Sequence, residues 1–375
     1  MNTTDEGTAT PAMAPADEQL AGLLAHYNLL VRRTIADTID EHAAPDAPAA
    51  PDAPDAPDQL YGIIRYHLGL ADANLKPRAA SSGKGLRGAL LLLVAGAFGG
   101  DEPAAAPLAA AIELLHNFSL VHDDIEDESA TRRHRATVWS IWGVPIGINA
   151  GDGLYALAHL ALYRSPLRDT DPRAFIDIMR AFEAAALRLA EGQHRDMTME
   201  GAARVSDTPV DDYLRMIEGK TASLIGAAAE LGARAGPGGA RQVVCAERFG
   251  RALGMAFQMQ DDILGIWGDE AVTGKSAVSD ITSRKKTLPV LLALAHGADD
   301  DRARLRALYA RAASGADDTR EILALLDRAG AHDLTRDYLR RYRDTALQAL
   351  SDAGLPDAAT ARLRAFERRF AERAE

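Results

Sequence analysis

Apolar residues recur at helical spacing along almost the whole of this 375-residue chain. From residue 59 onward nearly every segment has apolar positions three and four residues apart, and strands of alternating β-branched and aromatic residues are not evident. Glycine and proline interrupt the pattern at Gly99-Gly100, Pro145, Pro166, Pro172 and the run 236–239. At ordinary helix lengths, the pattern predicts an all-α protein with about ten or more helices.

The first 58 residues differ in pattern from the remainder. Residues 1–16 are small and acidic, and we predict a disordered tail there. Residues 17–41 have the spacing of an amphipathic helix. Residues 42–58 form an Ala/Pro/Asp stretch in which proline recurs at every third position, which opposes helix formation and predicts an extended linker. Residues 59–375 are predicted to form one all-α domain.

Composition and charge narrow the class of protein. Aromatic residues make up only 5% of the chain, so the core must be built from Ala, Leu, Ile and Val. The net charge of −12 argues against nucleic acid as a partner. The single cysteine, Cys245, excludes an internal disulfide and fits a reducing cytoplasm. Residues 1–16 lack the features of a signal peptide, and the apolar run 89–98 is shorter than the roughly 20 residues that span a bilayer. We therefore expect a soluble, cytoplasmic protein without stable membrane insertion.

Two clusters of aspartates end apolar helical runs. Asp123, Asp124 and Asp127 follow the run 112–121, and Asp123 and Asp127 would lie one helical turn apart on the same face. Asp261 and Asp262 close a second such run. Carboxylates on facing helices of a bundle can hold hard divalent cations, and Mg²⁺ in particular bridges one or two carboxylates to phosphate oxygens. The two clusters predict one cavity with carboxylates on opposing walls.

Further short motifs accompany these two clusters. They are Gly83-Lys84-x-x-Arg87, Arg132-Arg133, Gly192-Gln193, Lys220-Thr221 and Asp280-Ile281 before Lys285-Lys286-Thr287. With these motifs, and with Asp123-Asp124-x-x-Asp127 and Asp261-Asp262, the sequence resembles the trans-isoprenyl diphosphate synthases of the polyprenyl synthetase family over about residues 61–292. The resemblance implies a single large helical bundle of the isoprenoid synthase type around a central cavity. It also implies condensation of isopentenyl diphosphate with an allylic diphosphate by a homodimeric enzyme.

The reaction implied by the resemblance begins with ionisation of the allylic carbon–oxygen bond. Carboxylate-held Mg²⁺, about three ions per active site with diphosphate bound, would neutralise the leaving diphosphate. The implied metal ligands are Asp123, Asp127 and Asp261, with Asp124 and Asp262 as further ligands or as residues that orient the ligands. Together with Arg132 and Lys220, these five aspartates are the predicted catalytic residues.

Cationic side chains are expected to hold the two diphosphates, because guanidinium and ammonium groups pair with phosphate oxygens. The resemblance assigns Arg132, Lys220, Lys275 and Lys285 to the allylic diphosphate. It assigns Arg133 and the loop residues Gly83, Lys84 and Arg87 to isopentenyl diphosphate, with His67 as a further phosphate contact. Polar residues expected to line the cavity are Gln193, Thr221 and Gln258.

The chain departs from the family pattern at two positions. Gly265 stands where the family often has a third aspartate of the second motif, and Asp269 lies one further turn along. Gly88 stands where proline is usual. The first change leaves open how many carboxylates of the second motif hold a metal.

Product length is expected to depend on the helix that leads into the first motif. Phe118 and Ser119 lie five and four residues before Asp123, and this pairing resembles enzymes that make the twenty-carbon product. Geranylgeranyl diphosphate is therefore the predicted product, with a farnesyl or a longer-chain polyprenyl diphosphate as the alternative.

Three other functions agree less well with these residues. A terpene synthase of the same fold would have no use for Lys84, Arg87 and Arg133. A non-catalytic partner subunit would be expected to have lost aspartates that are present here. A carboxylate-bridged di-metal protein would need a second Glu-x-x-His pair besides Glu113 and His116.

Overall fold

A computed structural model describes residues 15–43, 56–78, 85–200, 208–268, 278–311 and 315–371. Within these ranges the chain is helical apart from a hairpin of two short strands, which confirms the predicted all-α class. The elements in chain order are α1 (Pro15–Ala43), α2 (Ala56–His67), α3 (Leu86–Ala97), α4 (Glu102–Glu126), β1 (Thr131–Arg132), β2 (Arg135–Ala136), α5 (Val138–Trp142), α6 (Val144–Tyr163), α7 (Leu167–Thr170), α8 (Pro172–Glu200), α9 (Val210–Ile217), η2 (Glu218–Ala222), α10 (Ser223–Ala235), α11 (Ala240–Trp267), α13 (Ser279–Thr282), α14 (Leu288–His296), α15 (Asp299–Tyr309), α16 (Ala316–Arg328), α17 (Ala331–Asp352) and α18 (Asp357–Ala371).

The N-terminal boundaries differ from the predicted ones by a few residues. Helix α1 starts at Pro15, two residues before the predicted helix start at residue 17, and continues to Ala43, and α2 begins at Ala56 within the predicted linker. Pro57 is the second residue of α2, where a missing N–H removes no intrahelical hydrogen bond. The rest of the predicted tail and linker, residues 1–14 and 44–55, lies outside the described residues.

The first hydrophobic core joins the N-terminal helices to the middle of the chain. It contains apolar side chains of α1, α3, α4, α6, α8 and α10, together with α18 and the adjoining ends of α11 and α17. Small residues let the helices approach closely here: a Cβ at Gly232 of α10 would lie 2.4 Å from the Leu91 carbonyl oxygen of α3. A core poor in aromatic residues is therefore filled by close backbone packing.

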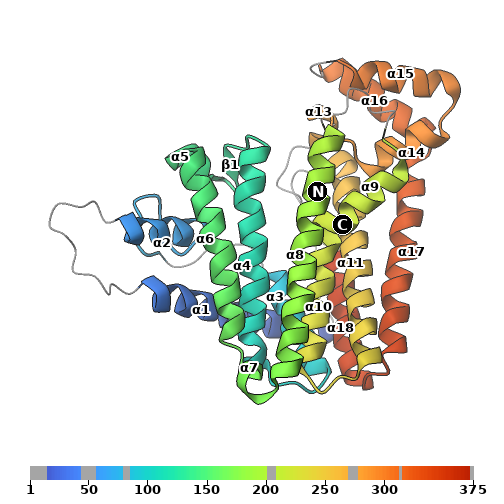
Figure 1. The fold of residues 1–375 in the computed structure, drawn as a ribbon. Helices are drawn as coiled ribbons and strands as arrows, with labels where there is room; N and C mark the ends of the chain where they lie inside the picture. The colour runs from blue at the N-terminus through green and yellow to red at the C-terminus, as the bar shows by residue number, and fades with distance from the viewer. Residues whose placement is uncertain are drawn as a thin grey trace, which may run out of the picture.

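A second hydrophobic core occupies the other end of the molecule. It is built from α9, α13, α14, α15 and α16, and from the remaining parts of α11 and α17. Figure 1 shows α11 and α17 running side by side along the molecule, with α15 and α16 at one end. The helix α11 thus carries Asp261 and Asp262 into the second core, whereas α4 carries the first acidic motif in the first core.

A π-helical turn, η2, interrupts the helix that runs from α9 into α10. It lies directly against α8, because a Cβ on Gly192 would be only 2.1 Å from the Lys220 backbone nitrogen. The same close approach is seen from η2, where a Cβ on Gly219 would lie 2.7 Å from the Arg188 carbonyl oxygen. Single π-turns inside helices frequently mark functional sites. This one presents Lys220 and Thr221.

Helix α4 is the one helix of the described residues that is long and apolar enough to cross a membrane by length and composition. Its most apolar stretch is 61% buried within the protein, as expected for the central helix of a packed core.

Candidate active site

The first acidic motif lies at the C-terminal end of α4. Asp123 and Asp124 are in its last turn, and Asp127 caps the helix with its backbone N–H bonded to the Asp123 carbonyl. Asp124 is buried, with 2% of its surface exposed, whereas Asp127 is exposed. The three carboxylates therefore face different surroundings although they belong to one turn.

The hairpin after α4 brings two arginines back to this motif. Its strands pair Thr131 with Ala136 and Arg132 with Arg135, so Arg133 and His134 form the two-residue turn. Both turn residues have positive φ, 52° and 60°, as a type I′ turn requires and as arginine and histidine rarely adopt. Backbone strain of this kind persists where neighbouring contacts impose it. The guanidinium of Arg135 stacks on the Tyr66 ring and donates to the Tyr66 carbonyl, which fixes the hairpin on α2.

Arg132 clamps the two adjacent aspartates of α4. Its Nε donates to Asp124 Oδ1 at 2.6 Å and its Nη2 to Asp123 Oδ2 at 3.1 Å. Burial raises the pKa of Asp124, and the guanidinium of Arg132 opposes that shift. The positive charge thus compensates for a carboxylate held out of water.

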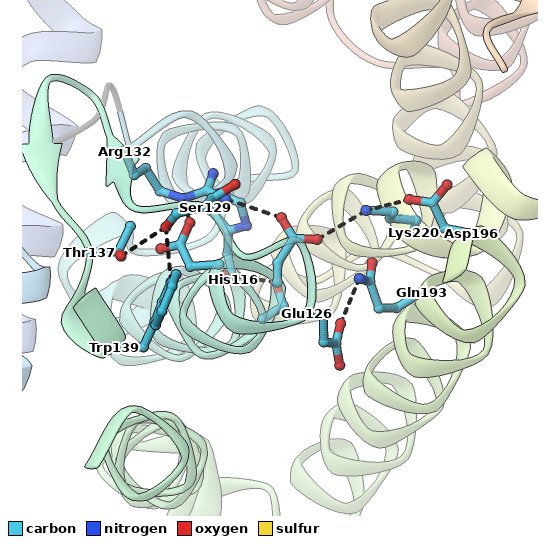
Figure 2. Close-up of polar contacts among 12 residues, drawn as sticks. His116, Glu126, Ser129, Arg132, Thr137, Trp139, Gln193, Asp196 and Lys220 are labelled. Atoms are coloured by element: carbon cyan, nitrogen blue, oxygen red, sulfur yellow. Dashed lines mark hydrogen bonds and ion pairs between the residues drawn. The ribbon is translucent and has the colours of Figure 1, made fainter. Parts of the chain in front are cut away.

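Lys220 reaches the same motif from the opposite side of the cavity. Its Nζ lies 3.0 Å from Asp123 Oδ1 and 2.6 Å from Asp196 Oδ2 of α8. Burial lowers the pKa of Lys220, but the Asp123 and Asp196 carboxylates outweigh it, and the pKa is raised. Figure 2 shows Lys220 and Asp196 on one side and Arg132 on the other, with Gln193 of α8 bonded to Glu126 of α4.

The second acidic motif has one buried and one more accessible carboxylate. Asp262 is 1% exposed and accepts hydrogen bonds from the Tyr213 hydroxyl, the Leu288 backbone N–H and the Gln258 side chain. Burial raises the pKa of Asp262 to about 6. Asp261 is partly exposed. Asp262 therefore fixes α9, α11 and α14 relative to one another. Of the two roles expected for it, metal ligand or residue that orients the ligands, these contacts suit the second.

A cationic pocket of about 290 Å³ lies beside the hairpin. The lining side chains include His67, Arg78, Arg132, Arg133 and Arg135. Two buried nitrogens here, Nε of the nearby Arg87 and Nε2 of His67, have no hydrogen-bond partner among the described residues. Burial lowers the pKa of His67 to about 3, so its ring is neutral at pH 7. An unpartnered guanidinium donor of Arg87 beside several cations would suit an anionic ligand.

A smaller pocket of about 50 Å³ lies between η2, α8 and the start of α14. Its lining includes Asp196, Lys220, Thr221, Gln258 and Lys285. Thr221 donates to Gln258 at 2.8 Å, so two of the three expected polar lining residues contact each other. Of the predicted residues, Gly83, Lys84 and Lys275 lie outside the described residues, as does Asp269.

Phe118 lies within an aromatic cluster that connects three helices. Its ring contacts His122 on α4 and Tyr155 on α6, with centroid separations of 4.8 and 5.1 Å. The Tyr155 hydroxyl donates to Glu183 on α8 at 3.2 Å, and His159 bonds to the same carboxylate. The position of Phe118 is thus fixed by neighbours on α6, which α8 holds in turn.

Among the described residues, no group of three or more His, Cys, Asp or Glu side chains is arranged to hold a metal ion by itself. The carboxylate chemistry nevertheless suits Mg²⁺, which is usually bound by one or two carboxylates plus substrate phosphates and water. Asp123 is paired here with Arg132 and Lys220, both of which can also pair with a diphosphate. The residues fit a metal that arrives with its diphosphate.

Several residues of this site were not predicted from the sequence. Asp196 lies one turn after Gln193 on α8, and that i,i+3 spacing from a predicted cavity residue could have found it. Tyr213 carried no comparable signal, and Glu113 was noted only for its Glu-x-x-His spacing with His116. Buried Glu113 accepts a hydrogen bond from the Gly88 N–H at 2.8 Å and lies near Arg87 and Arg133.

Comparison with known proteins adds independent information. Residues 71–326 match the family model described as polyprenyl synthetase. A geranylgeranyl diphosphate synthase of Mycobacterium tuberculosis is 44% identical over 294 residues, covering 78% of this chain and 80% of that protein. A (2E,6E)-farnesyl diphosphate synthase of the same species is 35% identical over 374 residues, covering 97% of both chains. The crystal structure of geranylgeranyl pyrophosphate synthetase from Pyrococcus horikoshii superposes with a TM-score of 0.81 at 31% identity, covering 95% of this chain and 98% of that one.

Proposed function

We propose that this chain, which belongs to the polyprenyl synthetase family and is a short-chain trans-prenyltransferase, makes geranylgeranyl diphosphate. The family joins isopentenyl diphosphate to an allylic diphosphate and depends in general on Mg²⁺. The chain-specific parts of the proposal are the product, the roles of the residues and the number of metal ions.

The observation that carries the proposal is the position of Asp123 between two cations from opposite walls. Arg132 approaches from the hairpin and Lys220 from η2, within 3.1 and 3.0 Å of the carboxylate. Cations that neutralise a carboxylate in the free protein are already at the place where a metal-bound diphosphate would arrive. We assign Asp123, Asp127 and Asp261 as metal ligands, with Asp124 and Asp262 orienting them.

Two separate cationic regions support two diphosphate sites. The pocket lined by His67, Arg132 and Arg133 lies on the hairpin side of the first motif. The pocket lined by Lys220 and Lys285 lies near the second motif. We assign the first region, with Arg87, to isopentenyl diphosphate and the second, with Arg132, to the allylic diphosphate. A cyclase without coupling activity would have no need for the first region.

In this assignment the protein stabilises the diphosphate that leaves the allylic carbon. Bound Mg²⁺ supplies Lewis-acid charge neutralisation, and about three ions per site would match the family. Lys220 and Arg132 pass from carboxylate to phosphate oxygens and stabilise the developing charge. The aromatic rings of Phe118 and Tyr155 help to exclude water from the carbocation. The released diphosphate can accept the proton that the coupled product loses.

The aromatic cluster supports a product of limited length. Phe118 is held by Tyr155, and Tyr155 by Glu183, so the ring cannot rotate away without breaking these contacts. A fixed aromatic ring on the helix that leads into the first motif would stop the growing chain. The twenty-carbon product is proposed on this basis, and the farnesyl and longer products are the alternatives.

A homodimer is proposed from the apolar surface at the start of α6. Ile141, Val144, Ile146 and Ile148 are each 38% to 43% exposed and lie close together in sequence. Exposed apolar side chains in one region mark an interaction surface, and a second copy of the chain is the occupant we assign. Light scattering of the wild type and of Ile148→Glu would test the proposed homodimer. We expect a dimeric wild type and a monomeric variant, and a monomeric wild type would contradict the proposal. We also expect a cytoplasmic location.

The product assay tests the proposed function directly. Purified protein is incubated with Mg²⁺, isopentenyl diphosphate and dimethylallyl, geranyl or farnesyl diphosphate in turn, and the dephosphorylated products are sized by mass spectrometry. A linear twenty-carbon alcohol is expected. A final product of fifteen carbons, or of more than twenty, would overturn the proposed product, and a cyclic hydrocarbon formed without isopentenyl diphosphate would overturn the coupling reaction. Chelation of Mg²⁺ should abolish turnover, and added Mg²⁺ should restore it.

A further inference from the structure

The turn of the β1–β2 hairpin has a backbone conformation that its residues disfavour. Arg133 and His134 have φ angles of 52° and 60°, in the left-handed region that glycine enters without a steric penalty. Turns of this type usually carry Asn-Gly at these two positions. Contacts elsewhere in the structure must therefore hold the chain in this conformation.

The base of the hairpin is fixed by hydrogen bonds of its own. Thr137 Oγ1 and Trp139 Nε1 both donate to the Ser129 carbonyl, at 2.8 and 2.9 Å. Arg132 Nε donates to the Asp124 carboxylate of α4 at 2.6 Å. None of these three bonds involves a residue of the turn, so the turn needs a separate support.

That support is a reciprocal clamp between Arg135 of β2 and Tyr66 of α2. The Arg135 guanidinium lies over the Tyr66 ring, 4.2 Å from its centroid, and its Nη2 donates to the Tyr66 carbonyl at 2.9 Å. The Tyr66 hydroxyl donates in return to the Ala136 carbonyl at 2.8 Å. Tyr66 is only 5% exposed, and its ring meets Trp142 of α5 edge to face at 5.1 Å. The clamp therefore anchors β2 to a buried residue directly after the turn.

The position of the turn determines where Arg133 lies. Arg133 lines the cationic pocket of about 290 Å³ beside the hairpin. Within the described ranges no side-chain hydrogen bond holds its guanidinium, whereas that of Arg132 is bonded to two aspartates. The place of Arg133 in the pocket therefore follows from the backbone of the turn. Arg135 lines the same pocket, so direct contact of Arg135 with a ligand is the alternative that an experiment must separate.

We propose that Arg135 and Tyr66 hold the strained turn so that Arg133 meets the diphosphate group of isopentenyl diphosphate. Arg135 is then a positioning residue, which acts through Arg133. The inference rests on the proposed function for the identity of the ligand. It implies that the clamp becomes dispensable when the turn itself favours the left-handed conformation, as it would with glycine in place of His134.

The test measures steady-state coupling with each of the two substrates varied in turn. Arg135→Met keeps a long side chain and removes the guanidinium. The KM for isopentenyl diphosphate should rise about tenfold, which corresponds to the loss of one charge-assisted contact between Arg133 and phosphate. The KM for the allylic diphosphate should change less than about twofold, because α4 holds Arg132 separately. Arg336→Met, which removes an exposed guanidinium on α17, is the matched control and should leave both KM values unchanged.

Substitution of His134 separates positioning from direct contact. In a His134→Gly background, Arg135→Met should raise the KM for isopentenyl diphosphate by no more than about threefold, because the two substitutions act on the same turn. Tyr66→Phe removes only the hydrogen bond to Ala136 and should raise this KM about threefold. Circular dichroism establishes that each variant is folded, and Tyr66→Phe decides the matter if Arg135→Met does not fold.

Three results would overturn the proposal. They are a wild-type KM for isopentenyl diphosphate in Arg135→Met, equal rises in KM for both substrates, and the full rise in the His134→Gly background, which would show that Arg135 contacts the ligand directly. Calorimetric titration with isopentenyl diphosphate repeats the comparison without turnover. A wild type that failed to couple would therefore refute the proposed function and leave the test of Arg135 intact.

Discussion

Gly192→Ala is the substitution that most directly tests how the fold positions Lys220. The new methyl group would lie 2.1 Å from the Lys220 backbone nitrogen and 2.5 Å from the Gly219 carbonyl carbon. Ordinary contacts between such atoms are about 3.5–4.0 Å. Helix α8 and the π-helical turn η2 would therefore have to separate by about 1 Å or more. Both neighbours are backbone atoms, so no side-chain rotation can relieve the overlap.

The stability change has two parts of opposite sign. Overpacking of a well-packed contact costs about 1–3 kcal/mol, and the upper end applies where backbone must move. Replacing glycine by alanine within a helix stabilises the helix by about 1 kcal/mol. We expect a net loss of about 2 kcal/mol in the free energy of unfolding. Because η2 carries Lys220, a displacement of about 1 Å should also lower kcat/KM about 100-fold.

Urea unfolding and steady-state coupling rates measure the two effects. Gly22→Ala is the matched control, because Gly22 lies exposed within helix α1 and a Cβ there would meet nothing within 4 Å. That variant should be stabilised by up to about 1 kcal/mol, with unchanged activity. If Gly192→Ala unfolds at the wild-type urea concentration and couples at the wild-type rate, the close contact between α8 and η2 has neither role.

Three further predictions concern individual side chains. Lys220→Gln should lower kcat/KM for the allylic diphosphate about 100-fold. Lys76→Gln, on an exposed loop, is the control and should leave kcat/KM unchanged. Equal kcat/KM values for the two variants would refute the role of Lys220. Because burial holds the pKa of His67 near 3, below its ordinary 6.5, the unfolded chain takes up the proton first as pH falls below 6.5. Between pH 7.5 and 5 the wild type should therefore lose about 2 kcal/mol more unfolding free energy than His67→Gln, as measured by urea unfolding at each pH. Equal losses in the two proteins would contradict this. Phe118→Ala should lengthen the product by one or more five-carbon units in the mass spectrum. An unchanged product would show that Phe118 does not limit chain length.

Local patterns in the sequence were sufficient to predict the helical class and the clustered aspartates. Helical spacing depends only on which residues face the core, and Asp123 and Asp124 adjoin each other along the chain. The hairpin that brings Arg132 back to this motif is equally local, but it was not predicted. The helix starts at Pro15 and Ala56 lie two and three residues before the predicted positions, because helix ends depend on contacts as well as on composition.

Contacts between distant segments could not be read from the sequence. Asp196 meets Lys220 only because Gly192 and Gly219 let α8 and η2 touch, and nothing in either segment alone indicates the pairing. Asp280 lies against Gly265 for the same kind of reason, 15 residues apart in sequence. The hydrogen bond of Tyr213 to Asp262 similarly depends on how α9 crosses α11. Each of these is a property of the packed bundle.

The division of the interior into two hydrophobic cores affects how the protein should respond to its ligands. One acidic motif is attached to the first core and the other to the second, and α11 and α17 connect them. A diphosphate with its metal ions bound to both motifs would cross-link the two cores. Without ligand the cores are free to unfold in separate calorimetric transitions, and with ligand they should merge into one at a higher temperature. Substrate would then determine the cooperativity of the whole molecule.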